Sequence, residues 1–322
     1  EALGVFDAFA AQVLLELKTP ILAVAGNHDG AQLIGYGRQL LGKVGLHVEG
    51  VFSAQVRKVV LCDEHGAVNF YLLPFADYQV VRDVLGDSQI KSLNEAMLAT
   101  MEQLRQDFDP LARNVLLTHG YITGGGDLEL SASEKPLSIG GKDYVSADSL
   151  AIFNYVALGH LHQAQRVGSD KIRYAGSILK YSFSEEQHKK SVTLVELDGA
   201  GQVSIQLLPL QPLHDMRTLV GELAELLQNV RTDLTDCYLQ VILTDCGEPI
   251  EPKRQLDAIY KRIMLFGMQN RLDTLRHSQL AGIERRNKTP LELCDEFCVF
   301  CTEHHLSEAE RSILEQLIEQ AD

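Results

Sequence analysis

Four short segments of this chain carry side chains that could do chemistry. They are Gly26-Asn27-His28-Asp29, Thr118-His119-Gly120, Gly159-His160-Leu161-His162 and Tyr174-Ala175-Gly176-Ser177. The first three each follow an apolar run, so their polar side chains are expected together at the ends of neighbouring strands. Such a gathering of amide and imidazole groups is typical of a two-metal phosphoesterase site.

The candidate metal ligands are one amide oxygen, from Asn27, and the imidazoles of His119, His160 and His162. This mixed set favours Mn²⁺, Fe²⁺ or Zn²⁺ over Ca²⁺ or Mg²⁺ alone. Positions 160 and 162 point the same way in an extended segment, so they could serve two ions about 3.5–4 Å apart. His28, beside a ligand, is the candidate catalytic group that stabilises the transition state or protonates the leaving oxygen. A single histidine after a strand is more often structural, and it is the joint, ordered occurrence that favours a metal site.

The elements that must position these residues follow from the apolar pattern of the first part of the chain. We expect helices over 3–17 and 92–108 and a Gly-rich, polar, substrate-side loop over 123–142. Strands are expected at 21–25, 59–62, 68–75, 114–118, 155–158, 172–174, 191–197 and 203–208. Residues 1–208 are therefore expected to form an α/β layered domain, with 59–62 and 68–75 as a hairpin.

The pattern changes after Pro209 and Pro212. We expect a small α+β domain over 209–285, with a helix at 216–230, a strand at 238–244, a helix at 253–266 and a strand near 271–275. The segments Thr289-Pro290-Leu291-Glu292 and Ser307-Glu308-Ala309-Glu310 both have the pattern of a capping box. Residues 286–322 are therefore expected to be helical.

Composition narrows the class of protein. No apolar run approaches the ~18 residues of a membrane span, and acidic residues stand where a signal peptide would have basic ones. A cytoplasmic protein without membrane contact is therefore expected. The net charge of −15 is unusual for a nucleic-acid binder, so any binding of DNA must be local, metal-assisted or shared with a partner.

The six cysteines do not form the dense framework of a secreted disulfide scaffold, so reduced thiols are expected. Cys294, Cys298 and Cys301, with His305 nearby, invite a zinc or iron–sulfur interpretation. Their spacing of three and four residues, shared with Leu291, instead favours one packing face of a helix.

The three histidine-bearing segments resemble the third, fourth and fifth motifs of the calcineurin-like metallophosphoesterases. Tyr174-Ala175-Gly176-Ser177, followed by Lys180-Tyr181-Ser182-Phe183-Ser184-Glu185 and His188-Lys189-Lys190-Ser191, narrows the resemblance to the bacterial SbcD-type exonuclease subunits. These are relatives of the Mre nucleases of double-strand break repair. The resemblance extends over nearly the whole chain and implies the layered α/β sandwich of a metallophosphoesterase for residues 1–208.

The resemblance implies a role for each site residue. Asn27, His119 and His160 would bind one of two Mn²⁺ ions, His162 would belong to the other, and His28 would be catalytic. Lys180 and Lys189, after the Gly-Ser segment, are the candidate substrate contacts. The resemblance also implies a capping domain that orients DNA ends and hairpins, and a homodimer within a heterotetramer. Its terminal helices would bind an SbcC-like ABC-type ATPase, and the apolar stripe Ile313, Leu314, Leu317 and Ile318 is compatible with that docking.

The family pattern also includes an Asp-x-His segment and a bridging aspartate ahead of the Asn-His-Asp segment, which the first 26 residues do not contain. Asp63-Glu64-His65 fits the first pattern by letters but falls in the predicted hairpin turn. A bridging carboxylate offsets the repulsion between two cations. We therefore expect these 322 residues alone to be inactive as a nuclease.

Two other functions remain open from the sequence. A phosphatase of small phosphoesters would use the same ligands, although it would not need a second domain or paired terminal helices. A non-catalytic scaffold for an ABC-type ATPase and DNA would not need to keep Asn27, His28, His119, His160 and His162.

Overall fold

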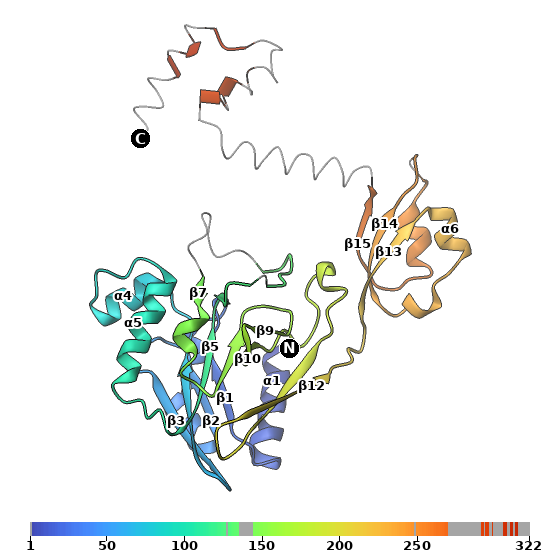
Figure 1. The fold of residues 1–322 in the computed structure, drawn as a ribbon. Coiled ribbons are helices and arrows are strands. Elements are labelled where there is room, and N and C mark those ends of the chain that lie inside the picture. Colours follow the sequence, from blue (N-terminus) through green and yellow to red (C-terminus); the bar gives the residue numbers. More distant parts are fainter. Residues whose placement is uncertain are drawn as a thin grey trace. The chain divides into compact units, whose positions relative to one another are not determined.

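The protein is seen in a computed structural model, which describes residues 2–126, 128–134, 144–247 and 249–269, and positions 291–292, 294–295, 298, 305–307, 310–311 and 313–314. The chain divides into two compact units, Glu1–Met216 and Arg217–Asp322 (Figure 1). Among the described residues, no helix combines the length and the apolar character that crossing a bilayer requires.

A six-stranded sheet forms the centre of the first unit, in the order β3-β4-β5-β8-β10-β9 (Figure 1). The four inner strands β4, β5, β8 and β10 run parallel, whereas the edge strands β3 and β9 are antiparallel to their neighbours. Burial on both faces explains the continuous apolar runs of β5 and β8, where Leu116 and Val156 are fully buried. The strands span Arg57–Asp63 (β3), Gly66–Leu73 (β4), Arg113–His119 (β5), Tyr155–Gly159 (β8), Gln165–Val167 (β9) and Ser169–Tyr174 (β10).

The predicted hairpin of β3 and β4 is present, and its turn occupies Glu64 and His65. Asp63, at the end of β3, forms an ion pair with the buried Arg113 at 2.6 Å. The Asp63-Glu64-His65 triplet therefore has a structural explanation, as the sequence pattern indicated.

A second, two-stranded parallel sheet pairs β1 (Ile21–Val24) with β2 (Leu46–Glu49). The end of β1 is tied to the segment after β4, because the backbone N–H of Phe75 donates to the carbonyl of Ala25 at 3.0 Å. The helix predicted before β1 is present as α1 (Ala2–Ala11), continued by a turn of π-helix over Gln12–Glu16. Two short helices, α2 (Ala31–Ile34) and α3 (Arg38–Leu41), and a 3₁₀ turn (Gly42–Val44) connect β1 to β2.

Two further helices, α4 (Tyr78–Leu85) and α5 (Leu93–Arg105), lie together beside the sheet, in cyan in Figure 1. The predicted helix over 92–108 thus exists, and Ser92 caps it by accepting the N–H of Glu95 at 3.2 Å. Its buried side chains, among them Met101 and Leu104, join one hydrophobic core with Leu116 of β5.

Another part of the core lies under the hairpin of β11 (Ser191–Leu197) and β12 (Val203–Pro209). Side chains of this hairpin pack against Val68, Val115 and Tyr155 of the central sheet. The remaining elements are the short parallel pair β6 (Ile122–Thr123) and β7 (Val145–Ser146), and 3₁₀ turns at Ala147–Leu150 and Phe183–Glu185. Helices and a hairpin covering a mostly parallel sheet confirm the predicted α/β class.

The second unit contains a three-stranded sheet in the order β13-β14-β15, with β14 and β15 parallel. Its elements are β13 (Met216–Gly221), α6 (Leu223–Gln228), a 3₁₀ turn (Thr232–Leu234), β14 (Tyr238–Leu243), α7 (Pro252–Asp257) and β15 (Ile263–Met268). The helices and strands share a core that includes the fully buried Leu239, Leu256 and Tyr260.

Two helix predictions in this unit were wrong in extent. The first half of 216–230 is the strand β13, and the end of 253–266 belongs to the strand β15. Both segments have apolar residues at helical spacing, yet pairing within the sheet overrides that local pattern. The strand predicted near 271–275 lies outside the described residues.

The capping box predicted at Ser307 is present. The Ser307 side chain donates to the Glu310 carboxylate at 2.6 Å, and the Ser307 N–H donates to the same oxygen at 2.9 Å. The predicted box at 289–292 and the stripe residues Leu317 and Ile318 lie at least partly outside the described residues.

Candidate functional site

One cavity of about 190 Å³ collects the side chains that the sequence singled out. It lies where β5 and β8, which pair in parallel, and β1 of the two-stranded sheet end. All five predicted residues line it, namely Asn27, His28, His119, His160 and His162. Ser133, Glu134, Leu161, Gly176 and Ser177 complete the lining.

Two glycines make room for the His119 ring. A methyl group on Gly26 would lie 2.6 Å from Cε1 of His119, and one on Gly159 would lie 2.9 Å from Nδ1. Both distances are shorter than a van der Waals contact, so a larger residue at either position would displace the ring. Gly26 and Gly159, which precede Asn27 and His160 in their own motifs, therefore leave the space that the His119 ring of another motif occupies.

His119 is also placed by its neighbours. Its Nε2 lies 2.8 Å from Oδ1 of Asn27, and its ring meets that of His160 edge-on with centroids 5.3 Å apart. Phe75 packs against it edge-on, with centroids 6.3 Å apart. Residues from three strand ends are thus in mutual contact.

The backbone at the cavity is unusual at His160, whose φ of +120° is a conformation that side-chain-bearing residues rarely adopt. Strained backbone of this kind concentrates at functional sites, where the surrounding structure holds it. The loop after β1 is held differently, because the Asp29 carboxylate accepts the Gly26 N–H at 2.7 Å. Asp29 therefore shapes the turn that presents Asn27 and His28.

Two cavity imidazoles are neutral at physiological pH. Burial lowers the pKa of His119 to about 4, with His160 adding to the effect and Asp29 opposing it. Burial also lowers the pKa of His160, although the nearby Glu134 opposes this shift. A neutral imidazole keeps a nitrogen lone pair, which metal binding requires.

His162 belongs to a network of buried polar groups. Its Nδ1 lies 2.8 Å from Oε1 of Glu185, a residue with no exposed surface. The hydroxyl of Ser133 donates to the same carboxylate oxygen at 2.7 Å, and the ammonium of Lys190 donates to the other oxygen at 2.7 Å. Burial would raise the pKa of Glu185, but hydrogen bonds from His162, Lys190 and Ser133 outweigh it and lower that pKa to about 2.

Glu134 supplies a carboxylate to the cavity wall. It accepts the backbone N–H of His162 and, through its other oxygen, that of Ser131 at 2.6 Å. The sequence did not indicate Glu134, Ser133, Glu185 or Lys190 as site residues. The only signal was that Glu185 and Lys190 stand in the run that carried the family resemblance.

Tyr174 explains why an aromatic residue opens the fourth segment. Its fully buried hydroxyl accepts the N–H of Ile122 at 2.6 Å and lies 2.9 Å from the carbonyl of Gly120. Gly176, at φ +77°, could not carry a side chain, because a methyl group there would lie 2.7 Å from the backbone N of Ala164. The fourth segment therefore fixes the loops that follow β5 and β8.

The two lysines predicted to contact substrate lie in different surroundings. Lys180 is largely buried, and its ammonium donates to Asp215 at 2.8 Å and to the Glu186 carbonyl at 2.7 Å. Lys189 is exposed. Neither lines the cavity that holds the histidines.

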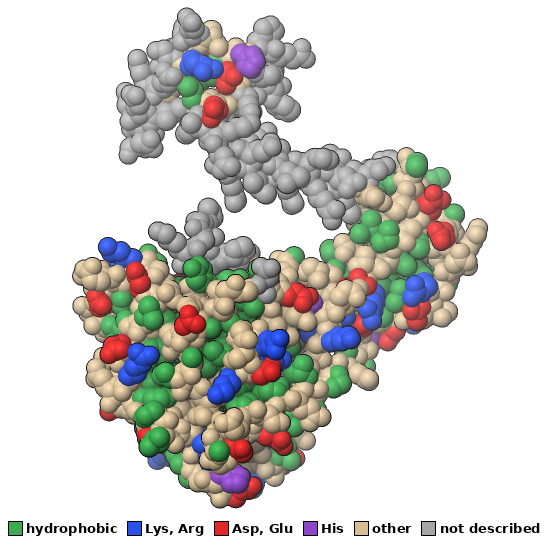
Figure 2. Space-filling view, viewed as in Figure 1, with side chains coloured by type: hydrophobic (Ala, Val, Ile, Leu, Met, Phe, Trp, Pro, Cys, Tyr) green, Lys and Arg blue, Asp and Glu red, His purple; other side chains and the backbone are tan. Residues whose placement is uncertain are grey.

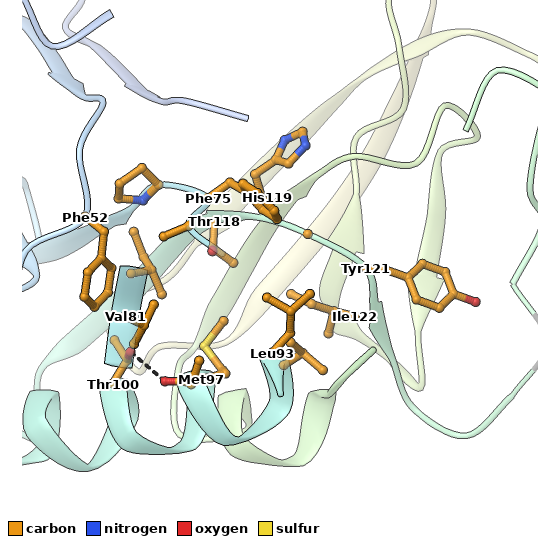
Figure 3. Close-up of a pocket in the computed structure, with 16 residues that line it drawn as sticks. Phe52, Phe75, Val81, Leu93, Met97, Thr100, Thr118, His119, Tyr121 and Ile122 are labelled. Carbon is orange, nitrogen blue, oxygen red and sulfur yellow. Dashed lines mark hydrogen bonds between the residues drawn. The ribbon is translucent and has the colours of Figure 1, made fainter. Parts of the chain in front are cut away.

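A second, mainly apolar cavity of about 50 Å³ is also lined by His119 (Figure 3). Met97 and Leu93 of α5 border it below, and Phe52, Val81 and Phe75 lie around it in the same view. His119 thus lines both cavities, and the apolar side chains around the second contribute to the burial that lowers its pKa.

The donor types around the polar cavity suit a transition metal, since they are an amide oxygen and neutral imidazoles. Among the residues that the structure describes, however, no three His, Cys, Asp or Glu side chains are grouped closely enough to hold one ion. Asn27 and His119 are instead hydrogen-bonded to each other.

The surface seen in Figure 2 mixes basic and acidic side chains over the described part of the first unit. No continuous basic patch covers this face of the described residues, in keeping with the net charge of −15. Nonspecific attraction to phosphates on this face is therefore weak.

The structure is a mixed α/β fold whose cavity gathers an amide and imidazoles, and it is consistent with the metallophosphoesterase type. Comparison with known proteins agrees. Residues 212–300 match the family described as the type 5 capsule protein repressor C-terminal domain of SbcD. The chain is also 28% identical over 320 residues to the SbcD subunit of the SbcCD nuclease of Staphylococcus epidermidis, an alignment that covers 99% of this chain and 83% of that protein. These findings support an SbcD-type nuclease, as the motifs had predicted.

Proposed function

We propose that this chain belongs to the nuclease subunit of an SbcCD-like complex, and that the subunit hydrolyses DNA phosphodiester bonds at double-strand ends and hairpins within that complex. The observation that carries the proposal is the convergence of Asn27, His28, His119, His160 and His162 on one cavity. The similarity along the whole chain to the SbcD subunit of an SbcCD nuclease supports the same function.

The proposed cofactor is a pair of Mn²⁺ ions. Asn27, His119 and His160 would hold one ion, and His162 would belong to the other. When bound, two such ions supply electrostatic stabilisation of the phosphodiester and a hydroxide nucleophile. His28, exposed at the cavity, is the proposed catalytic group that protonates the leaving oxygen.

The proposed substrate contacts differ in how they would act. Lys189 is exposed and free to approach a phosphate. Lys180 would first have to leave its ion pair with Asp215, so its contribution to DNA binding is expected to be smaller. The proposed partner is an SbcC-like ABC-type ATPase that binds residues 286–322, within a heterotetramer containing two copies of this chain.

The test uses the product of the complete gene together with its ATPase partner. Cleavage of blunt and hairpin DNA is measured with Mn²⁺ for the unaltered protein and for His119→Ala and His160→Ala. Loss of a residue that only orients a metal ligand typically lowers activity by about 10–100-fold. Loss of a ligand itself is expected to lower the cleavage rate by more than that. His65→Ala is the matched control, because His65 lies exposed in the β3–β4 turn, and it should cleave normally.

The same preparations are then tested with p-nitrophenyl phosphate derivatives. Turnover of these small esters without cleavage of DNA would reject the nuclease proposal in favour of a small-phosphoester phosphatase. Equal DNA cleavage by the unaltered protein and both histidine variants would reject the proposed site.

A further inference from the structure

Glu185 is the most completely buried acidic side chain near the cavity, with no exposed surface. A buried carboxylate is costly unless its oxygens are paired, and here both oxygens are. Oε1 lies 2.8 Å from Nδ1 of His162 and accepts the Ser133 hydroxyl at 2.7 Å, while Oε2 accepts the Lys190 ammonium at 2.7 Å.

Lys190 fixes the direction of these hydrogen bonds. Its ammonium can only donate, and it donates to the backbone carbonyl of His162 at 2.8 Å and to the Ser177 hydroxyl at 2.8 Å, as well as to Glu185. Its Nζ, 6% exposed, forms an ion pair with Glu185 at 2.7 Å and also lies 3.4 Å from Nδ1 of His188, so that Glu185 receives this hydrogen bond as a carboxylate. An ionised carboxylate can only accept hydrogen bonds.

The proton on His162 is therefore determined by its neighbour. Nδ1 also lies 3.1 Å from Oγ of Ser133, which gives its single hydrogen to Glu185 and so can only accept from the ring. Because both neighbours of Nδ1 accept, Nδ1 of a neutral His162 carries the hydrogen, and the lone pair is left on Nε2. We propose that Glu185 is a positioning residue that fixes His162 as the Nδ1–H tautomer and so leaves Nε2 free as a donor atom. The benefit of this tautomer for metal binding rests on the proposed function, whereas the tautomer itself does not.

The first test needs no substitution. The chain is labelled with ¹⁵N-histidine, and the ring nitrogens of His162 are observed by NMR at about pH 8, above the usual histidine pKa of about 6.5. The His162→Gln variant identifies the signals. A protonated Nδ1 with an unprotonated Nε2 is expected, and the opposite pattern would overturn the proposal.

The second test is Glu185→Gln, which keeps the size of the side chain. The Lys190 ammonium cannot accept a hydrogen bond, so the amide oxygen of Gln should turn toward it. The amide NH₂ would then face Nδ1 of His162. Nδ1 must then accept, and the ring should change to the Nε2–H tautomer. The same replacement in a Ser-His-Asp triad acts through a wrong tautomer in this way.

A rescue separates positioning from general structural damage. In the double variant Glu185→Gln with Lys190→Met, the amide oxygen is free to face His162, so the Nδ1–H tautomer should return. The matched control is Glu129→Gln, whose carboxylate lies 3.7 Å from His188 at the exposed end of the same region and should leave His162 unchanged. Failure of Glu185→Gln to shift the tautomer, or of the double variant to restore it, would overturn the proposal. If the single variant does not fold, the His162 tautomer is still measured in the unaltered chain and in the double variant. An unprotonated Nδ1 in either protein would overturn the proposal.

A metal titration distinguishes this inference from the proposed function. Zn²⁺ is titrated into the complete gene product and its variants by calorimetry. An outer-shell partner typically contributes about 10–100-fold to metal affinity, so Glu185→Gln should weaken binding by that factor and the double variant should restore it. A shifted tautomer with unchanged Zn²⁺ affinity would support the positioning role and reject His162 as a metal ligand.

Discussion

Oδ1 of Asn27 lies 2.8 Å from Nε2 of His119, although 92 residues separate them in the sequence. The contact joins the loop after β1 to the end of β5. It depends on two glycines that leave room for the imidazole, so the first predictions concern the packing around this ring.

Gly26→Ala is expected to lower DNA cleavage by about 10²-fold, the effect that displacement of a group by about 1 Å can have on a reaction. The new methyl group would lie 2.6 Å from the His119 ring and push it away from Asn27. Mn²⁺-dependent cleavage by the complete gene product is the measurement. Gly247→Ala is the control, because nothing lies within 4 Å of its added methyl group. A fully active Gly26→Ala protein would show that the close fit around His119 is not needed.

Tyr174→Phe is expected to destabilise the first unit by about 1–3 kcal/mol, because the N–H of Ile122 would be buried without a partner. The change keeps the ring and removes only the hydroxyl that accepts this N–H at 2.6 Å. Urea unfolding, followed for the transition of the first unit, measures the effect. Tyr36→Phe serves as the control, since Tyr36 is 82% exposed. Equal midpoints for both variants would contradict the assigned role.

Lys190→Met alone is expected to cost about 3–5 kcal/mol, because it leaves a buried charge on Glu185 without its ion-pair partner. Combining it with Glu185→Gln should recover much of this loss, since the pair is then replaced by uncharged groups of similar size. Thermal unfolding of the two variants is compared. A double variant that is less stable than Lys190→Met would contradict this explanation.

The Asp63–Arg113 ion pair should make stability depend on acid pH. Hydrogen bonds from the Arg113 guanidinium lower the pKa of the Asp63 carboxyl to about 2, below its ordinary value of 3.8. A lowered folded-state pKa means that the stabilisation is complete above about pH 4 and is lost as the pH falls toward 2. Asp63→Asn should therefore lose stability at pH 5 and differ less from the unaltered protein at pH 2.5, as measured by urea unfolding. Glu64→Gln, at an 86% exposed neighbour in the same turn, should show no such change.

The terminal stripe can be tested by co-purification with the ATPase. Ile313 is 59% exposed, as expected of a residue that docks on a partner. The combined change Leu314→Asp and Leu317→Asp should abolish co-purification without unfolding the first unit, because charge would enter an apolar contact. Leu111→Asp is the control, at a leucine that is 94% exposed outside this segment. Retained co-purification would reject this role of the stripe.

Much of the fold could be predicted from local patterns. Apolar runs located β1, β5 and β8, and the capping box at Ser307 was recognised, because these features depend on residues close together in the chain. The same reasoning failed at 216–221 and 263–268, where helical spacing was present but the residues pair in a sheet. Strand pairing is a contact between distant segments, and a local window does not contain it.

The site divides in the same way. The sequence by itself indicated that Asn27, His28, His119, His160 and His162 would meet, because each stands at the end of an apolar strand segment, and β5 and β8 do pair in parallel and end at a common edge. That β1 brings Asn27 and His28 to the same cavity from a separate two-stranded sheet was decided by the tertiary structure. Only the tertiary structure decided that Lys180 pairs with Asp215, that Glu134 enters the cavity wall, and that Glu185 and Lys190 form the buried support of His162. These side chains come from loops, and which loop groups become partners depends on how distant segments pack and exclude water.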